Sequence, residues 1–181
     1  RKMKQHLVIV LVAALIALIA ARDVCAPTSD SCDFYLQCLE KVKPCGIAGY
    51  AMGYGDKYCN KFSQRVFHSD KAKKWLVSAK QCLQETLVPI IQNPDAYTCD
   101  QIVDIAFNSH PKCYTQKAAS ICTILDPRDL VSILFTVDGK DLFSRKSFIQ
   151  IKDVVAICAT GRSGSLAEQG EEVEYEADML H

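Results

Sequence analysis

Apolar residues recur along most of this chain at spacings of three and four positions, whereas stretches that alternate apolar and polar residues are scarce. The first spacing places apolar side chains on one face of a helix, and a strand would require alternation. The clearest helix is predicted over residues 69–87, where Ser69 or Asp70 caps the first turn and Pro89 ends the helix. Gln84 falls on its polar face together with four lysines. The apolar face carries Ala72, Trp75, Leu76, Ala79, Cys82 and Leu83.

Shorter helices are predicted by the same spacing before and after this one. They cover residues 33–42, 57–67, a short stretch that starts at Asp95 or Thr98, then 111–122, 127–135 and 144–158. Pro111 is predicted to open the fourth of these, and Asp126 to cap the fifth ahead of Pro127. Gly161 is predicted to stop the last helix.

The segment 46–55 contains four glycines and is predicted to be a loop. Its tyrosines, Tyr50 and Tyr54, belong either to a tethered loop, which we favour, or to a contact surface. Later in the chain, the helical spacing favours packing of Phe135 and Phe148 in the core. If they lie outside the core instead, a noncovalent dimer becomes possible. Because no segment has a strand pattern, the predicted fold class is all-α.

All the cysteines lie between an apolar leader and an acidic tail. Their number is even and no two are spaced as C-x-x-C, which favours a disulfide framework over a metal site if the compartment is oxidising. The architecture is therefore predicted to be a disulfide-stapled helical bundle. Ten cysteines allow a very large number of pairings, and the sequence alone does not choose among them. They are Cys25, Cys32, Cys38, Cys45, Cys59, Cys82, Cys99, Cys113, Cys122 and Cys158.

The leader predicts an oxidising compartment. Residues 1–21 combine basic residues, an apolar run and the small residues Ala20 and Ala21, in the order of a secretory signal peptide. The apolar run is shorter than a membrane-spanning helix needs, so we expect a secreted, extracellular protein without stable membrane insertion. Residues 22–161 then form the domain. Residues 162–181 carry six carboxylates against one arginine and are predicted to be a disordered acidic tail.

Several function classes find little support in the sequence. No basic stripe indicates nucleic acid, and His68 and His110 are not part of a metal-ligand pattern, so we expect no nucleic-acid partner, metal or cofactor. No enzyme is predicted, because the chain lacks the His-Asp-bearing helix of secreted phospholipases, and residues 161–165 are not a nucleophile elbow. A secreted lipid-binding or toxin-like helical module is the alternative to a protein ligand.

The cysteine spacing resembles that of the stanniocalcins, which are secreted helical hormones. The motifs that carry the resemblance are Cys38-Leu39-Glu40, the segment from Tyr58 to Phe62, the helix from Trp75 to Cys82-Leu83, and Cys113-Tyr114 before Cys122. The resemblance implies a hormone-like ligand that regulates calcium and phosphate homeostasis. It also implies an extracellular protein partner or receptor, including metalloproteases of the pappalysin type.

The resemblance further implies a specific disulfide pairing. Carried over position by position, the pairs are Cys25–Cys38, Cys32–Cys59, Cys45–Cys99, Cys82–Cys113 and Cys122–Cys158. The stanniocalcins commonly carry an eleventh cysteine that joins two chains, and this chain has none after Cys158. We therefore expect no covalent dimer.

Overall fold

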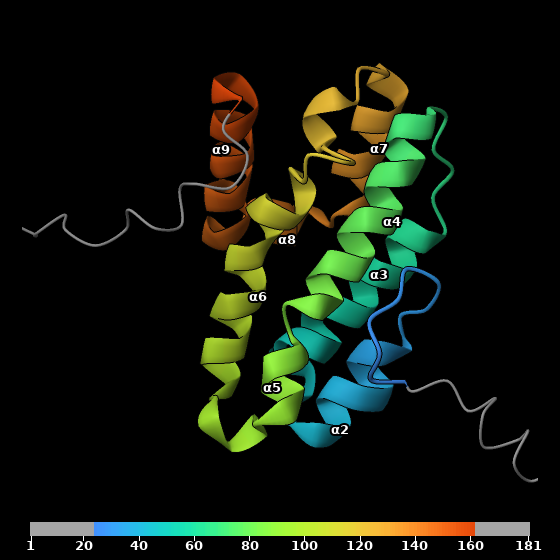
Figure 1. The fold of residues 1–181 in the computed structure, drawn as a ribbon. Coiled ribbons are helices and arrows are strands. Elements are labelled where there is room, and N and C mark those ends of the chain that lie inside the picture. The colour runs from blue at the N-terminus through green and yellow to red at the C-terminus, as the bar shows by residue number, and fades with distance from the viewer. Residues whose placement is uncertain (1–23, 162–181) are drawn as a thin grey trace, which may run out of the picture.

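The computed structural model describes residues 24–161, and every regular element among them is helical (Figure 1). The predicted signal peptide and acidic tail lie outside the described residues. In chain order the elements are η1 (Phe34–Leu39), α2 (Glu40–Val42), η2 (Gly46–Ala48), η3 (Ala51–Gly55), α3 (Asp56–Ser63), α4 (Asp70–Glu85), α5 (Val88–Gln92), η4 (Pro94–Ala96), α6 (Cys99–Tyr114), η5 (Ile121–Thr123), α7 (Pro127–Thr136), α8 (Gly139–Leu142) and α9 (Arg145–Thr160).

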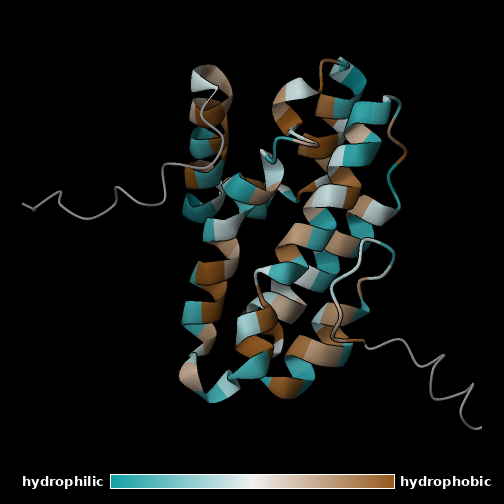
Figure 2. Ribbon diagram, in the orientation of Figure 1, coloured by the Kyte–Doolittle hydropathy of each residue, from teal (hydrophilic) through white to brown (hydrophobic). Residues whose placement is uncertain are grey.

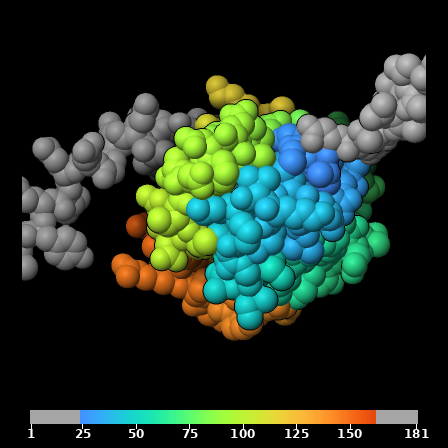
Figure 3. All heavy atoms as spheres, turned by 90° about the horizontal axis from the view of Figure 1, so that it is seen from below, coloured from blue at the N-terminus to red at the C-terminus, as the bar shows by residue number. Residues whose placement is uncertain are grey.

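Of the three longest helices, α4 and α6 pack against each other and run in opposite directions, with α5 between them at one end (Figure 1). At that end, η1, η3 and α5 enclose a core that includes Phe34, Leu39, Leu87 and Ile90. Figure 3 shows how closely the N-terminal elements and the α5 region meet there. A second core surrounds Trp75 near the other end, where α9 packs against α6 and α8.

Most predicted helix ends are present, and several helix starts have the side-chain cap expected from the sequence. Ser69 Oγ accepts a hydrogen bond from Ala72 N at 3.1 Å at the start of α4. Asp126 Oδ1 accepts one from Arg128 N at 2.9 Å in front of α7, and Ser144 does the same for α9. Gly161 follows α9 with a φ of 64°, a left-handed conformation that glycine adopts without strain. These ends are therefore determined by local sequence.

The prediction of a loop over residues 46–55 is wrong, because this segment forms η2 and η3 and runs directly into α3. Tyr50 is buried and packs edge-on against Tyr35 and Phe107, so it belongs to neither a tethered loop nor an exposed contact surface. A Cβ atom at position 55 would overlap the Tyr35 ring, so Gly55 permits this close approach. Gly55 therefore serves helix packing, whereas Gly46 adopts a left-handed conformation, with a φ of 68°, at the start of η2.

Two proline predictions are also wrong. Pro111 does not open a helix but lies within α6, which extends from Cys99 to Tyr114. Tertiary contacts offset the cost of a proline inside a helix: Pro111 is buried, and the Cys82–Cys113 disulfide ties this turn to α4. Pro89 does not end α4, which stops at Glu85. It instead lies in the first turn of α5, where no backbone N–H is required.

Gln84 is buried, although it was expected on the polar face of its helix. Its side-chain oxygen accepts a hydrogen bond from Thr28 N at 2.8 Å, and its nitrogen donates to Ser31 O at 3.1 Å. The side chain therefore satisfies the backbone of the N-terminal segment, which lies over α4. Such a contact between distant segments cannot be inferred from the period of a single helix.

Candidate functional site

The ten cysteines, which are the predicted site residues, form five intrachain disulfides and leave no free thiol. The pairs are the five that the resemblance implies, with Cα atoms 5.3–5.8 Å apart: Cys25–Cys38, Cys32–Cys59, Cys45–Cys99, Cys82–Cys113 and Cys122–Cys158. Such a framework is compatible with an extracellular protein. The bonds are structural, so the functional surface must be sought among other side chains.

The described residues contain neither a cluster of metal ligands nor a helix suited to span a membrane. Between residues 24 and 161, no group of three His, Cys, Asp or Glu side chains is arranged to hold a metal ion. In the same part of the chain, none of the helices is long and apolar enough to cross a lipid bilayer.

Helix α7 has its amphipathic character reversed. Its solvent side carries Leu130, Val131, Leu134 and Phe135, and the Phe135 side chain is 76% exposed. Its buried side carries Asp129 and Thr136, which are almost completely excluded from solvent. The expectation that Phe135 packs in the core is therefore wrong.

The contacts of Asp129 with a distant segment explain the reversal. Its two carboxylate oxygens accept hydrogen bonds from His68 N at 2.7 Å and Ser69 N at 2.9 Å, just before α4. The carboxylate therefore satisfies backbone N–H groups at the start of that helix and lies at the positive end of its dipole. Because this contact turns Asp129 inward, the apolar residues of α7 are turned outward.

Helix α9 contains several apolar residues, which appear as brown stretches in Figure 2, and some of them are exposed. Phe148 is 67% exposed and Ile151 and Val155 are exposed as well, so the prediction of core packing is wrong for Phe148 too. On the side toward α6, the only fully buried residue is Ile157. The disulfide from Cys158 to Cys122 holds the end of the helix.

The exposed side of α9 is positively charged as well as apolar. Arg145 and Lys152 lie three or four positions from Phe148, and residues at this spacing are neighbours on a helix surface. Neither cation forms an ion pair with another described residue. We call the exposed residues of both helices the late apolar surface: Leu130, Val131, Leu134, Phe135, Phe148, Ile151 and Val155.

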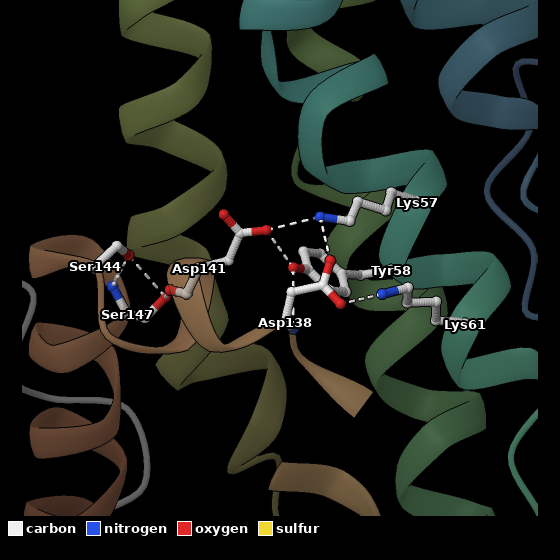
Figure 4. Close-up of polar contacts among 7 residues, drawn as sticks. All are labelled: Lys57, Tyr58, Lys61, Asp138, Asp141, Ser144 and Ser147. Carbon is white, nitrogen blue, oxygen red and sulfur yellow. Dashed lines mark hydrogen bonds and ion pairs between the residues drawn. The ribbon is translucent and has the colours of Figure 1, made fainter. Parts of the chain in front are cut away.

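An ion-pair network joins α3 to the segment between α7 and α9 (Figure 4). Lys57 Nζ lies 2.7 Å from a carboxylate oxygen of both Asp138 and Asp141. Lys61 pairs with Asp138, and the Tyr58 hydroxyl donates to Asp141. Since these two aspartates flank the start of α8, the network fixes the connection between the two helices of the late apolar surface.

Continuing toward α9, Ser147 Oγ donates to the backbone oxygen of Asp141 at 2.6 Å (Figure 4). Hydrogen bonds from Lys57 and Lys61 lower the pKa of Asp138 to about 2. Burial acts to raise the pKa of Asp141, but the bonds from Lys57 and Tyr58 outweigh it and lower that pKa. Both carboxylates are therefore ionised at neutral pH.

We predict that Asp138 titrates near pH 2 in the native protein. In a Lys57→Met variant its pKa should rise toward the ordinary aspartate value of about 4, because one of its two cationic partners is lost. Carboxyl carbon NMR shifts recorded against pH measure both values. Lys71→Met, which removes an exposed lysine outside the network, should leave the titration unchanged. An Asp138 pKa near 4 in the native protein would contradict the network.

A scan against protein-family models, a search of curated proteins and a search of solved structures each found no match to this chain. The resemblance to the stanniocalcins therefore rests on the cysteine spacing and the motifs quoted above. Phe135 and Phe148, which were expected in the core, are exposed. In the sequence, the signal for this arrangement of α7 is Asp129, a carboxylate on the side of the helix opposite its exposed apolar residues.

Proposed function

We propose that the protein is a secreted, hormone-like polypeptide that acts by binding an extracellular protein partner through the late apolar surface. The observation that carries this proposal is the reversed amphipathic character of α7. Exposed apolar area is costly in water, and large apolar residues gathered on one exposed helix face, as on α7, mark interaction sites. Aromatic residues such as Phe135 and Phe148 are enriched in the centres of protein interfaces.

The charges beside the apolar residues indicate the chemistry of the partner. Arg145 and Lys152 flank Phe148 on α9, so a complementary surface would be an apolar groove bordered by carboxylates. The resemblance to the stanniocalcins extends the proposal to a named class of partner, the pappalysin-type metalloproteases. It also extends it to hormone-like regulation of calcium and phosphate. In this proposal the protein is a ligand and not an enzyme.

The test measures binding of the secreted chain to a pappalysin-type metalloprotease by surface plasmon resonance. We expect saturable binding that weakens by about tenfold to a hundredfold in the Phe135→Ser/Phe148→Ser variant, because two apolar anchors are lost. Ile47→Ser is the matched control. Ile47 is 84% exposed but belongs to η2, at the other end of the molecule, and its replacement should not change binding.

Other occupants of the surface would overturn the proposal in distinguishable ways. No binding of the native chain to the metalloprotease would exclude this partner class. Flotation of the native chain with anionic liposomes, lost in the double variant, would show a lipid-binding surface instead. A dimer in sedimentation that becomes monomeric in the double variant would show that the surface joins two copies of the chain.

A further inference from the structure

A cavity of about 110 Å³ lies between the two cores, where α3, α4 and α6 meet α9. Eight tyrosine, phenylalanine and tryptophan residues contribute to its wall, among them Phe62, Trp75, Phe107 and Tyr114. Three further lining residues, Lys80, Ser147 and Asp141, are only half-buried, so one side of the cavity reaches solvent. An engineered apolar cavity of about 150 Å³ accommodates benzene. This cavity is smaller but open to solvent on one side, so a single-ring molecule can occupy it and extend toward solvent.

Two buried N–H groups of the lining residues have no hydrogen-bond partner among the described residues. They are the indole Nε1 of Trp75, whose side chain is 2% exposed, and the amide Nε2 of Gln150. Buried donors are almost always paired in folded proteins, because an unpaired donor has lost its hydrogen bonds to water. The cavity thus combines apolar walls with two donors that lack an acceptor.

The side-chain oxygen of Gln150 lies against the His110 ring. The His110 ring lies with Nδ1 2.7 Å from Gln150 Oε1 and with Nε2 3.1 Å from the Tyr50 hydroxyl. Burial lowers the pKa of His110 to about 4, so the ring is neutral at pH 7. A neutral ring that donates to the Gln150 oxygen and accepts from Tyr50 uses both nitrogens, and it leaves the amide Nε2 as the unpartnered group.

The charged residues at the cavity are already engaged. Asp141 is paired with Lys57, and Lys80 Nζ donates to Ser63 Oγ at 2.7 Å. A charged ligand would lose its hydration in this largely aromatic cavity, and an anionic one would also lie near the ionised Asp141, so both are unfavourable. The ligand that fits is uncharged, largely apolar and able to accept a hydrogen bond.

We propose that this cavity is a binding site for a small uncharged aromatic molecule whose acceptor oxygen takes hydrogen bonds from Trp75 and Gln150. The site is separate from the late apolar surface and does not depend on its partner. It belongs to the described fold of the chain and needs no second protein.

The experiment uses the fact that Trp75 is the single tryptophan of the chain, so its indole N–H gives one identifiable signal in proton–nitrogen NMR spectra. The secreted chain is titrated with acetophenone, with ethylbenzene and with benzoate. We expect acetophenone to shift the indole signal saturably and to bind about tenfold or more tightly than ethylbenzene, which has the same shape without the oxygen. Benzoate should bind more weakly than acetophenone because it is charged.

Two variants locate the binding. Ala79→Leu fills the cavity from α4 and should abolish the acetophenone shift, whereas the same change at the exposed Ala159 of α9 should not affect it. Gln150→Leu should remove most of the preference for acetophenone over ethylbenzene. Far-UV circular dichroism checks that each variant is folded. The comparison of acetophenone with ethylbenzene uses the native chain, so it does not depend on the variants.

The proposal is overturned if neither neutral compound shifts the indole signal saturably, since the cavity then holds at most water. Equal affinity for acetophenone and ethylbenzene would remove the role of the two donors. Binding of acetophenone that persists unchanged in folded Ala79→Leu would place the site elsewhere.

Discussion

Alanine in place of both Cys45 and Cys99 should lower the free energy of unfolding by about 4 kcal/mol. Among the five disulfides, this one joins the residues that are furthest apart in sequence, with a separation of 54. It connects the segment before η2 to the first residue of α6. In the loop-entropy model, a longer closed loop restrains the unfolded chain more strongly, so its removal has the larger effect. Urea unfolding followed by far-UV circular dichroism measures the change.

The matched control for this prediction is the pair Cys25→Ala/Cys38→Ala, which opens the shortest disulfide loop, with a separation of 13. The same model gives a loss of about 3 kcal/mol there. Both double variants leave an even set of cysteines, so no unpaired thiol complicates refolding. A Cys45/Cys99 variant that lost less stability than the control would contradict the dependence on loop length.

Replacing Asp129 by alanine should lower the free energy of unfolding by about 3 kcal/mol at pH 7. The variant loses two hydrogen bonds to a charged acceptor and leaves the N–H groups of His68 and Ser69 without a partner. Asp70→Ala is the control, since it removes an exposed carboxylate from the first turn of α4, the helix whose start Asp129 contacts. Its expected effect is below about 1 kcal/mol. Equal losses in both variants would contradict the role of Asp129.

The contribution of Asp129 should also depend on pH. Burial acts to raise its pKa, but the hydrogen bonds from Ser69 and His68 outweigh burial and lower it. A carboxyl with a lowered pKa stabilises the fold above its unfolded-state pKa of about 3.9, and this contribution is lost as the pH falls through its folded-state pKa. The stability difference between the native chain and Asp129→Ala should therefore shrink below about pH 4.

The Asp129 variant also bears on the proposed function, because the same contact turns the apolar residues of α7 outward. If α7 is released, Leu134 and Phe135 are free to turn toward the core, and the late apolar surface changes. Asp129→Ala should therefore weaken partner binding even though the side chain is buried and touches no partner. The binding assay above, applied to folded Asp129→Ala, measures this effect.

The cavity and the late apolar surface use different residues of the same late helix. Gln150 lies on the side of α9 toward α6, while Phe148 and Ile151 lie on its solvent side. A ligand bound at Gln150 would contact the inner face of a helix whose outer face is proposed to bind a protein. The Phe135→Ser/Phe148→Ser variant should retain acetophenone binding, which separates the two proposals experimentally.

The sequence by itself determined the helical class and most helix ends. The period of three and four residues is a local property, and so are the caps at Ser69, Asp126 and Ser144, whose side chains bond to backbone two or three residues away. Gly161 likewise stops α9 by its own conformation. The pairing of the cysteines was not accessible in this way, and it was anticipated only through a family resemblance.

Tertiary structure decided which apolar residues are buried. A helical period shows that Phe135 and Phe148 share a face with other apolar residues, but it does not show what that face meets. The Asp129 side of α7 faces the protein interior because the carboxylate accepts hydrogen bonds from backbone N–H groups about sixty residues earlier in the chain. Likewise, Tyr50 became a core residue because Gly55 admits the ring of Tyr35. In both cases a contact between distant segments outweighed the local pattern. Such a contact depends on two parts of the chain, so it cannot be inferred from the sequence of one segment alone.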